Sequence, residues 1–239
     1  MRNKAFKGKT CVYCTVDGSS TTADHVLARE FFPADQRHGI PKVPACNACN
    51  NEKSHLEHYL ATVLPFGGRH PQSRAILSEL VPPRIKRNRK LLHELASSWN
   101  SGVSISPNGY LQPQHTFNVD ADKIEQLYEF IVRGLCWSEW QLLLPKSLSE
   151  IQVGFLTSDG AAIAESLLRL NPKRKSQRVI ADGLFQYEGV QAVDNDLITI
   201  WKMSLYGVEF ADGENPNEHA FICYASSGPL GKVLPIGRN

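Results

Sequence analysis

The sequence predicts an α+β protein, and three patterns in its 239 residues support that fold class. Residues 120–145 repeat apolar side chains at the spacing of an amphipathic helix. Residues 178–190, 197–210 and 219–225 are rich in β-branched and aromatic side chains and are divided by turn-forming residues, which is typical of a mainly antiparallel sheet. Two Cys-x-x-Cys pairs near the beginning indicate a further, smaller unit.

The region around the cysteine pairs should contain a turn, short strands and one helix. Residues 11–15 have the composition of a turn between short strands. Apolar side chains recur at helical spacing over residues 50–64, so we expect a helix there. Pro65 and the Gly67-Gly68 pair should end it.

The rest of the chain alternates helices, turns and strands. Residues 72–98 predict two helices separated by a Pro-Pro pair at 82–83. Residues 103–112 contain an Asn-Gly dipeptide between apolar residues and predict a small hairpin. After the helix at 120–145, we expect a strand at 153–159 and a helix at 160–171.

Charge is divided unevenly along the chain. Residues 1–117 carry 15 Lys and Arg against 8 Asp and Glu, whereas residues 118–239 carry 11 against 16. A basic first part suits a polyanionic partner. We therefore expect three parts: a cysteine-rich module at 1–64, a basic helical connector with a hairpin at 65–117, and an acidic α+β domain at 118–239.

The sequence predicts a cytoplasmic protein that does not enter a membrane. No stretch approaches the roughly 20 apolar residues of a membrane helix, and the basic start has no apolar core behind it, unlike a secretory signal. Four of the six cysteines fall in close pairs, which favours reduced thiols that bind metal over a disulfide framework. Cys136 and Cys223 lie among apolar residues and should be inert members of the core.

The two cysteine pairs predict a structural zinc site. Cys11 and Cys14 form one pair, Cys46 and Cys49 form the other, and 31 residues separate them. Each tight turn can present two thiolates to one ion, so two turns complete a tetrahedral site. Zn²⁺ bound there would contribute to the free energy of folding. A chance cluster or one redox-active pair is the alternative, but two pairs within one short basic segment favour zinc.

Further residues of chemical interest surround these cysteines. Asp24 and His25 lie between the pairs, Asn50 follows the second pair directly, and Lys53 comes three residues later. The pattern C-x2-C, D-H-V, C-x2-C-N-x2-K resembles the HNH endonuclease family over residues 8–62, about a quarter of the chain. The wider run resembles a bacterial subgroup with an extra carboxy-terminal domain. The resemblance implies a ββα-metal fold, in which a hairpin and a helix hold one divalent ion.

The resemblance also implies an activity, hydrolysis of phosphodiester bonds in nucleic acid, with DNA as the first candidate and RNA not excluded. His25 would be the general base that activates water, while Asp24 and Asn50 would bind a catalytic Mg²⁺ or Mn²⁺. An imidazole is about half-protonated near neutral pH, so it accepts a proton at little cost. The zinc site would fix the position from which Asn50 reaches the catalytic ion. The simpler alternatives are a core histidine at His25 and a helix cap at Asn50.

Two positions depart from the family pattern. The middle asparagine of the motif has no clear counterpart, since Pro41 or Val43 stands in that region, and Ser54 occupies a position where some members have a metal-binding histidine. These departures keep a second hypothesis open: a catalytically inactive zinc-knuckle module that binds nucleic acid or regulates a partner.

Basic residues after the second cysteine pair are candidate phosphate contacts. They are Lys53, Arg84, Lys86, Arg87, Arg89 and Lys90. For the run at 84–90, a solvated helix face is an equally good interpretation. The acidic domain at 118–239 has no assigned role, and a homodimer or a protein partner through it is left open. A bacterial or phage-borne setting fits the resemblance.

Overall fold

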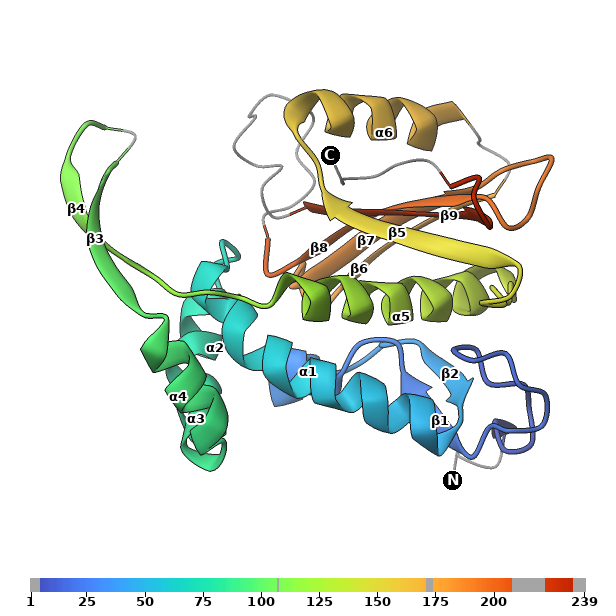
Figure 1. Cartoon of the computed structure of the whole chain (residues 1–239), viewed down its shortest axis with the longest axis horizontal. Helices are drawn as coiled ribbons and strands as arrows, with labels where there is room; N and C mark the ends of the chain where they lie inside the picture. The colour runs from blue at the N-terminus through green and yellow to red at the C-terminus, as the bar shows by residue number, and fades with distance from the viewer. Residues whose placement is uncertain (1–4, 107, 171–173, 208–221, 234–239) are drawn as a thin grey trace.

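The computed structural model describes residues 5–106, 108–170, 174–207 and 222–233. The fold is α+β, as predicted, and the strand pairs in its three sheets are all antiparallel. Figure 1 shows helix α5 (Ala121–Trp140) between two layers, with a five-stranded sheet on one side and the N-terminal unit on the other. Within the described ranges, none of the helices combines the length and the apolar character needed to cross a membrane.

The N-terminal unit is a short hairpin followed by a long helix, which is consistent with the expected ββα order. Strand β1 (Thr22–His25) pairs with β2 (Lys42–Ala45). Two short 3-10 helices, η2 (Arg29–Phe31) and η3 (Ala34–Gln36), lie in the loop between them. Helix α1 (Asn47–Gly67) begins directly after β2 and contacts both β1 and α5.

Helix α1 confirms the predicted helix at 50–64 and extends beyond both of its ends. It begins earlier because the Sγ of Cys46 caps it, accepting a hydrogen bond from the backbone N–H of Cys49. It continues past Pro65, which lacks the N–H that would bond to the carbonyl of Ala61. The guanidinium of Arg84 donates to that carbonyl instead, so the helix ends only at Gly67.

The connector contains three short helices instead of the two expected. They are α2 (Ser73–Glu79), α3 (Val81–Arg87) and α4 (Arg89–Ser97). The proline pair falls in the first turn of α3, where a helix makes no use of the backbone N–H. The unexpected break lies at Asn88, whose side chain accepts from the N–H of Leu91 and so caps α4. The predicted hairpin is confirmed as β3 (Asn100–Ile105) and β4 (Leu111–Thr116).

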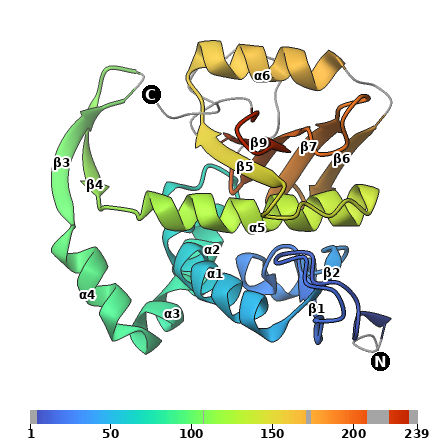
Figure 2. The same cartoon turned by 45° about the vertical axis from the view of Figure 1, so that its right-hand side comes forward.

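The C-terminal part is a five-stranded sheet with one helix on each face, as Figures 1 and 2 show. Helix α6 (Ser158–Leu170) covers one face and α5 the other. The strands run in the order β5-β9-β8-β7-β6. Their bounds are β5 (Ser149–Phe155), β6 (Lys175–Ile180), β7 (Phe185–Gln191), β8 (Thr199–Leu205) and β9 (Ile222–Pro229). Positions 171, 208–210 and 219–221 of the predicted segments lie outside the described residues.

One continuous hydrophobic core joins the N-terminal unit to the C-terminal sheet through α5. The ring of Tyr13 meets that of Phe130 edge-on, with 5.0 Å between centroids. A Cβ at Gly134 would lie 2.9 Å from Val26, so the missing side chain lets α5 approach the end of β1. The boundary expected at 117–118 therefore does not coincide with a gap in the core, and the proposed division into domains stays a prediction.

Replacing Gly189 by alanine should destabilise the sheet. An added Cβ would lie 2.3 Å from the indole of Trp201, which is fully buried and held by a hydrogen bond to Thr199. Overpacking of this kind costs about 1–3 kcal/mol, and the rigid ring favours the upper end. Urea unfolding measures the change. The control is Gly102→Ala in β3, where a Cβ meets nothing within 4 Å; equal losses in both variants would contradict the prediction.

Candidate metal centre and its neighbours

Cys11, Cys14, Cys46 and Cys49 come together, as predicted. Their sulfur atoms all lie within 4.8 Å of one another, so the group could hold a structural metal ion such as zinc. Backbone N–H groups point at two of the sulfurs: that of Cys46 at the Sγ of Cys11, 3.3 Å away, and that of Cys49 at the Sγ of Cys46, 3.5 Å away. Such donors stabilise thiolates, which are the species that bind zinc.

The clustered thiols favour a cation for an electrostatic reason. Burial raises the pKa of Cys11, and burial together with the neighbouring sulfurs raises that of Cys49, because charged thiolates would be desolvated and would repel one another. A divalent ion bound at the centre of the cluster would offset the desolvation and the mutual repulsion of the thiolates, and would thereby lower both pKa values. Cys136 and Cys223, in contrast, are fully buried, and burial raises the pKa of both, so the expectation that they lie in the core is confirmed and their inertness stays a prediction.

Asp24 and His25 end β1, where β2 fixes their backbone. Asp24 lies opposite Val43 and His25 opposite Lys42. The next N–H, that of Val26, donates to the carbonyl of Pro41 at 2.9 Å. Val43 in β2 and Pro41 just before it are the residues expected at the position of the middle asparagine, and pairing with this segment holds the backbone around His25.

The imidazole of His25 is half-buried in a positively charged surrounding. Burial lowers its pKa to about 4, with the positive charges of Lys42, Arg29 and Lys53 acting in the same direction and Asp24 opposing them. The ring is therefore neutral at physiological pH, and a pKa this low makes it a weaker base than a free imidazole. Of these cations, Lys42 and Arg29 are exposed and provide a positive potential beside the ring, which suits an anionic ligand.

Lys53 is fully buried and does not face solvent, which corrects the expectation that it contacts a phosphate. Its Nζ donates to the carbonyl of His25 at 2.8 Å, lies 3.1 Å from the Oδ2 of Asp24, and forms an ion pair with Glu57 one turn along α1. The hydroxyl of Tyr13 donates to the same Oδ2 at 2.6 Å. Lys53 thus fastens α1 to the end of β1. Sequence reasoning missed Tyr13 and considered Glu57 only as a possible aid to metal binding; the Lys53–Glu57 spacing of four was the available signal for the ion pair.

Asn50 lies in the first turn of α1, one turn before Lys53, and is half-buried. Its N–H donates to the carbonyl of Cys46 at 3.0 Å, so it is a helical residue and Cys46 is the cap. Asn50 therefore lies at the start of α1, beside Cys46 and Cys49 of the cysteine cluster. Lys53, one turn later on the same helix, contacts Asp24.

A second metal ion would have to use a sparse set of ligands. Among the described residues, the four cysteines are the only group of three or more His, Cys, Asp or Glu side chains close enough to share an ion. The contacts of Asp24 fall on Oδ2, and within the described chain no hydrogen bond or ion pair engages its Oδ1. Oδ1 of Asp24 is an oxygen donor of the kind that suits Mg²⁺, and whether it shares an ion with the amide oxygen of Asn50 stays a prediction.

The basic run at the junction of α3 and α4 divides into two kinds of residue. Arg84 donates to the carbonyls of Ala61 and Glu30, so it has a structural role, and its contact with nucleic acid stays a prediction. The other four residues are exposed, and among the described residues none of them forms an ion pair. They are Lys86, Arg87, Arg89 and Lys90.

Comparison of the chain with models of protein families, with curated proteins and with solved structures finds no match in any of the three.

Proposed function

We propose that this protein is a metal-dependent HNH-type endonuclease that hydrolyses phosphodiester bonds in nucleic acid, most simply DNA. The observation that carries the proposal is the junction of β1 with α1. A neutral histidine and an adjacent carboxylate end β1, and Lys53 joins them to a helix whose start holds Asn50 and two of the four clustered cysteines. A nuclease of this class needs those side chains at that junction.

In the proposed reaction, His25 takes a proton from water as the water oxygen attacks phosphorus, and the bond from phosphorus to the leaving 3′ oxygen breaks. Asp24 and Asn50 would hold the divalent ion, which when bound offsets negative charge on the phosphate and the leaving oxygen. Lys53 keeps the backbone of His25 and the carboxylate of Asp24 in fixed positions, because it contacts both. Such fixed geometry lowers the entropic cost of reaching the transition state.

A groove on the same helix supports nucleic acid as the substrate. It has a volume of about 630 Å³ and lies between α1 and α3. Among its lining residues are His55 and His58 from α1 and Arg87 from α3. Glu30 also lines it and pairs with the Nδ1 of His58 at 2.9 Å. Together with the exposed basic run beside it, the groove offers cationic and hydrogen-bonding groups for a phosphate backbone.

One observation favours the second candidate, a zinc-knuckle module that binds nucleic acid without cutting it. The Oδ2 of Asp24 is already engaged by Lys53 and Tyr13, so half of the carboxylate is committed to a structural ion pair. A metal ion would have to bind through Oδ1 alone. The two candidates differ in whether His25 and a divalent ion are needed for any activity.

Replacing His25 by alanine should abolish cutting while nucleic-acid binding persists. Plasmid cleavage is measured on gels with Mg²⁺, with Mn²⁺ and with EDTA, and binding by gel shift in EDTA. Loss of a general base lowers the rate by about 10²- to 10⁴-fold. His93→Ala, an exposed position on α4, is the matched control and should cut normally. Equal cutting by His25→Ala removes the catalytic assignment, and binding with no cutting by the parent under either metal favours the inactive module.

A further inference from the structure

The hairpin of β3 and β4 projects from the body of the molecule as an arm, at the left of Figures 1 and 2. Eleven of its twelve strand residues are exposed, and Ser104 is half-buried. Residues 95–119 contain no Asp, Glu, Lys or Arg, although such residues make up 21% of the whole chain. An exposed segment of this length without charge is unusual, because charged side chains normally protect exposed strands from unwanted pairing.

The arm has one apolar face and one polar face. Cross-strand pairing places Val103 opposite Pro113 and Ile105 opposite Leu111, so these four side chains share a face. Val103, Ile105 and Leu111 are 67%, 72% and 75% exposed. The other face carries the small and amide residues Asn100, Gly102, Ser104, Gln112, Gln114 and Thr116. This alternation is typical of a strand pair that is covered on one side, and a two-stranded hairpin alone is only marginally stable in water.

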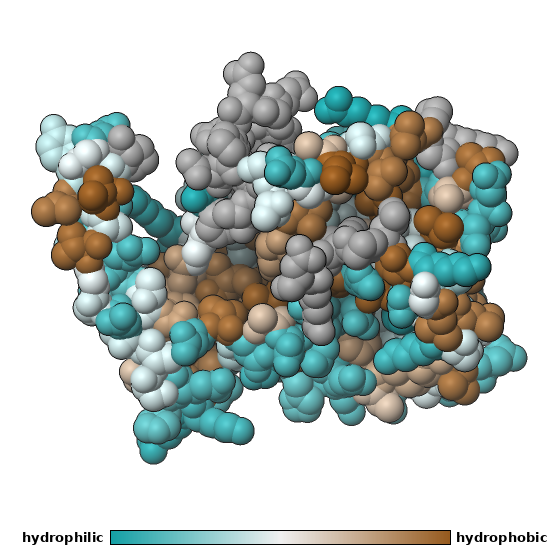
Figure 3. All heavy atoms as spheres, turned by 45° about the horizontal axis from the view of Figure 1, so that its top comes forward, coloured by the Kyte–Doolittle hydropathy of each residue, from teal (hydrophilic) through white to brown (hydrophobic). Residues whose placement is uncertain are grey.

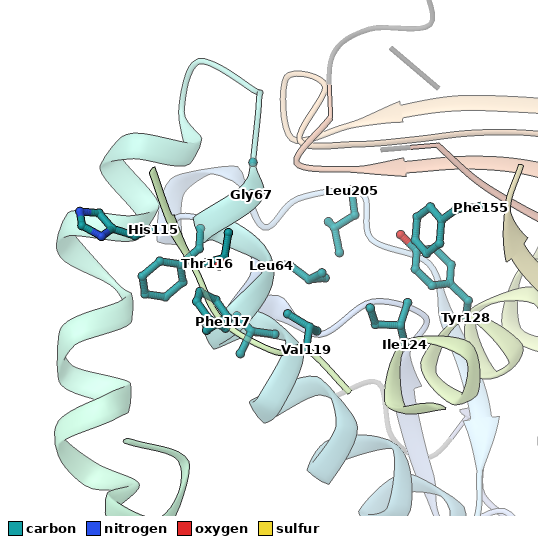
Figure 4. Close-up of a pocket in the computed structure, with 13 residues that line it drawn as sticks. Leu64, Gly67, His115, Thr116, Phe117, Val119, Ile124, Tyr128, Phe155 and Leu205 are labelled. Atoms are coloured by element: carbon teal, nitrogen blue, oxygen red, sulfur yellow. The ribbon is translucent and has the colours of Figure 1, made fainter. Parts of the chain in front are cut away.

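The base of the arm is firmly packed and has apolar hollows on its surface. The ring of Trp99 stacks on those of His115 and Phe117, and Phe117 meets Phe66 edge-on. One hollow of about 330 Å³ lies against α1 and α5, where Figure 4 shows Phe117, Val119 and Ile124. Another of about 340 Å³ lies against α4 and includes Leu92 and Trp99. Figure 3 shows hydrophobic side chains both on the arm and in the recess beside it.

The arm cannot fill the hollows at its own base. Leu111 lies five residues along β4 from Thr116, which is a distance of about 17 Å at the rise of a strand, whereas both hollows adjoin Phe117. The apolar face near the tip is therefore left uncovered by the described part of its own chain and is available to a partner molecule. Nucleic acid does not fit that role, because the arm has no cation to contact phosphates.

We propose that a second copy of this chain covers the arm: two molecules exchange arms, and the apolar face of each lies in the hollows at the base of the other. Both surfaces are uncharged and apolar, and they occur on the same chain, so a two-fold axis satisfies both at once and doubles the area buried. Pro113 lacks an N–H, which disfavours the addition of a strand at the edge of β4, and the proposed contact uses the apolar face of the arm.

Sedimentation velocity over a range of concentrations tests this proposal. The parent should sediment as twice its chain mass of 26.6 kDa. Ile105→Lys and Leu111→Lys place a charge on the apolar face and should raise the dimer dissociation constant at least ~10-fold, giving monomers at concentrations where the parent is dimeric. Gln114→Lys adds the same charge to the polar face and should remain a dimer. The replaced side chains are exposed, so thermal unfolding of the dilute variants should match that of the dilute parent.

The hollow is tested separately by Leu92→Lys, which changes the receiving surface and leaves the arm intact. This variant should also be monomeric, and an equimolar mixture of Leu92→Lys with Ile105→Lys should not recover the parent's affinity. A monomeric parent at ~100 μM, or dimers that survive Ile105→Lys, would overturn arm exchange. Dimers that survive Leu92→Lys but not Ile105→Lys would show arms packed on each other, and would overturn the placement in the hollows.

Discussion

Replacing Cys49 by serine should remove the metal from the protein and unfold the N-terminal unit. Serine cannot supply the fourth thiolate, and structural zinc in small modules contributes about 10–16 kcal/mol of apparent binding free energy. The loss should spread beyond the cluster for two reasons. Cys11 and its neighbours Val12 and Tyr13 belong to the shared core, and Cys46 caps α1. We expect zinc content to fall from one ion per chain to near zero and the melting temperature to fall by more than ~10 °C.

Metal content by mass spectrometry and thermal unfolding, each with and without a zinc chelator, measure this effect. The chelator should destabilise the parent strongly and the Cys49→Ser variant little, because the variant has no metal left to lose. Cys223→Ala is the matched control, since it removes a buried thiol of the C-terminal sheet and leaves the cluster intact. Unchanged zinc stoichiometry in Cys49→Ser would rule out the four-thiolate site.

The fold was predictable where the signal in the sequence is local. Cysteine spacing predicted the metal cluster, helical periodicity predicted α1 and α5, and an Asn-Gly turn predicted the hairpin. The start of α1 was missed because a cysteine caps it, and cysteine is not among the residues that usually occupy that position. The end was missed because the effect of Pro65 depends on Arg84, a residue 19 positions later that bonds to the freed carbonyl.

The candidate site was only partly predictable, because its least expected feature is a buried charge. Lysine is almost never fully buried, so a phosphate contact was the natural expectation for Lys53. Its burial depends on partners from β1 that lie 28 and 29 residues earlier, and no local pattern indicates them. Whether the exposed basic run, Asn50 and His25 act on nucleic acid stays a prediction.

Replacing Lys53 by methionine should destabilise the protein by about 3–5 kcal/mol. The side chain has a similar length and fits the same space, but it leaves the buried carboxylates of Asp24 and Glu57 without their cation. It also leaves the carbonyl of His25 without its donor. Chemical unfolding measures the change, and Lys90→Met, at an exposed residue of α4, should be nearly neutral.

The penalty for Lys53→Met should depend on pH because of Glu57. Burial raises the pKa of Glu57 to about 7, even though Lys53 lowers it. A carboxyl whose pKa is raised on folding stabilises the folded state below its unfolded value of 4.5, and this contribution is lost as the pH rises towards 7. Without Lys53 the pKa of Glu57 rises further, so the variant keeps losing stability at higher pH. The penalty should therefore be larger at pH 8 than at pH 5.

Lys53→Arg and Glu57→Gln separate charge from geometry. Arginine keeps the positive charge, but its planar guanidinium cannot take the place of one ammonium group among the oxygens of His25, Asp24 and Glu57. Lys53→Arg should therefore recover part of the lost stability and little of the proposed cleavage. Glutamine at 57 removes the titrating partner while Lys53 keeps Asp24 and His25, so it should flatten the pH dependence and preserve cleavage. If Lys53→Met were as stable as the parent at pH 8, the ammonium would not join β1 to α1 in solution. The positions of Asp24 and His25 would then need another support.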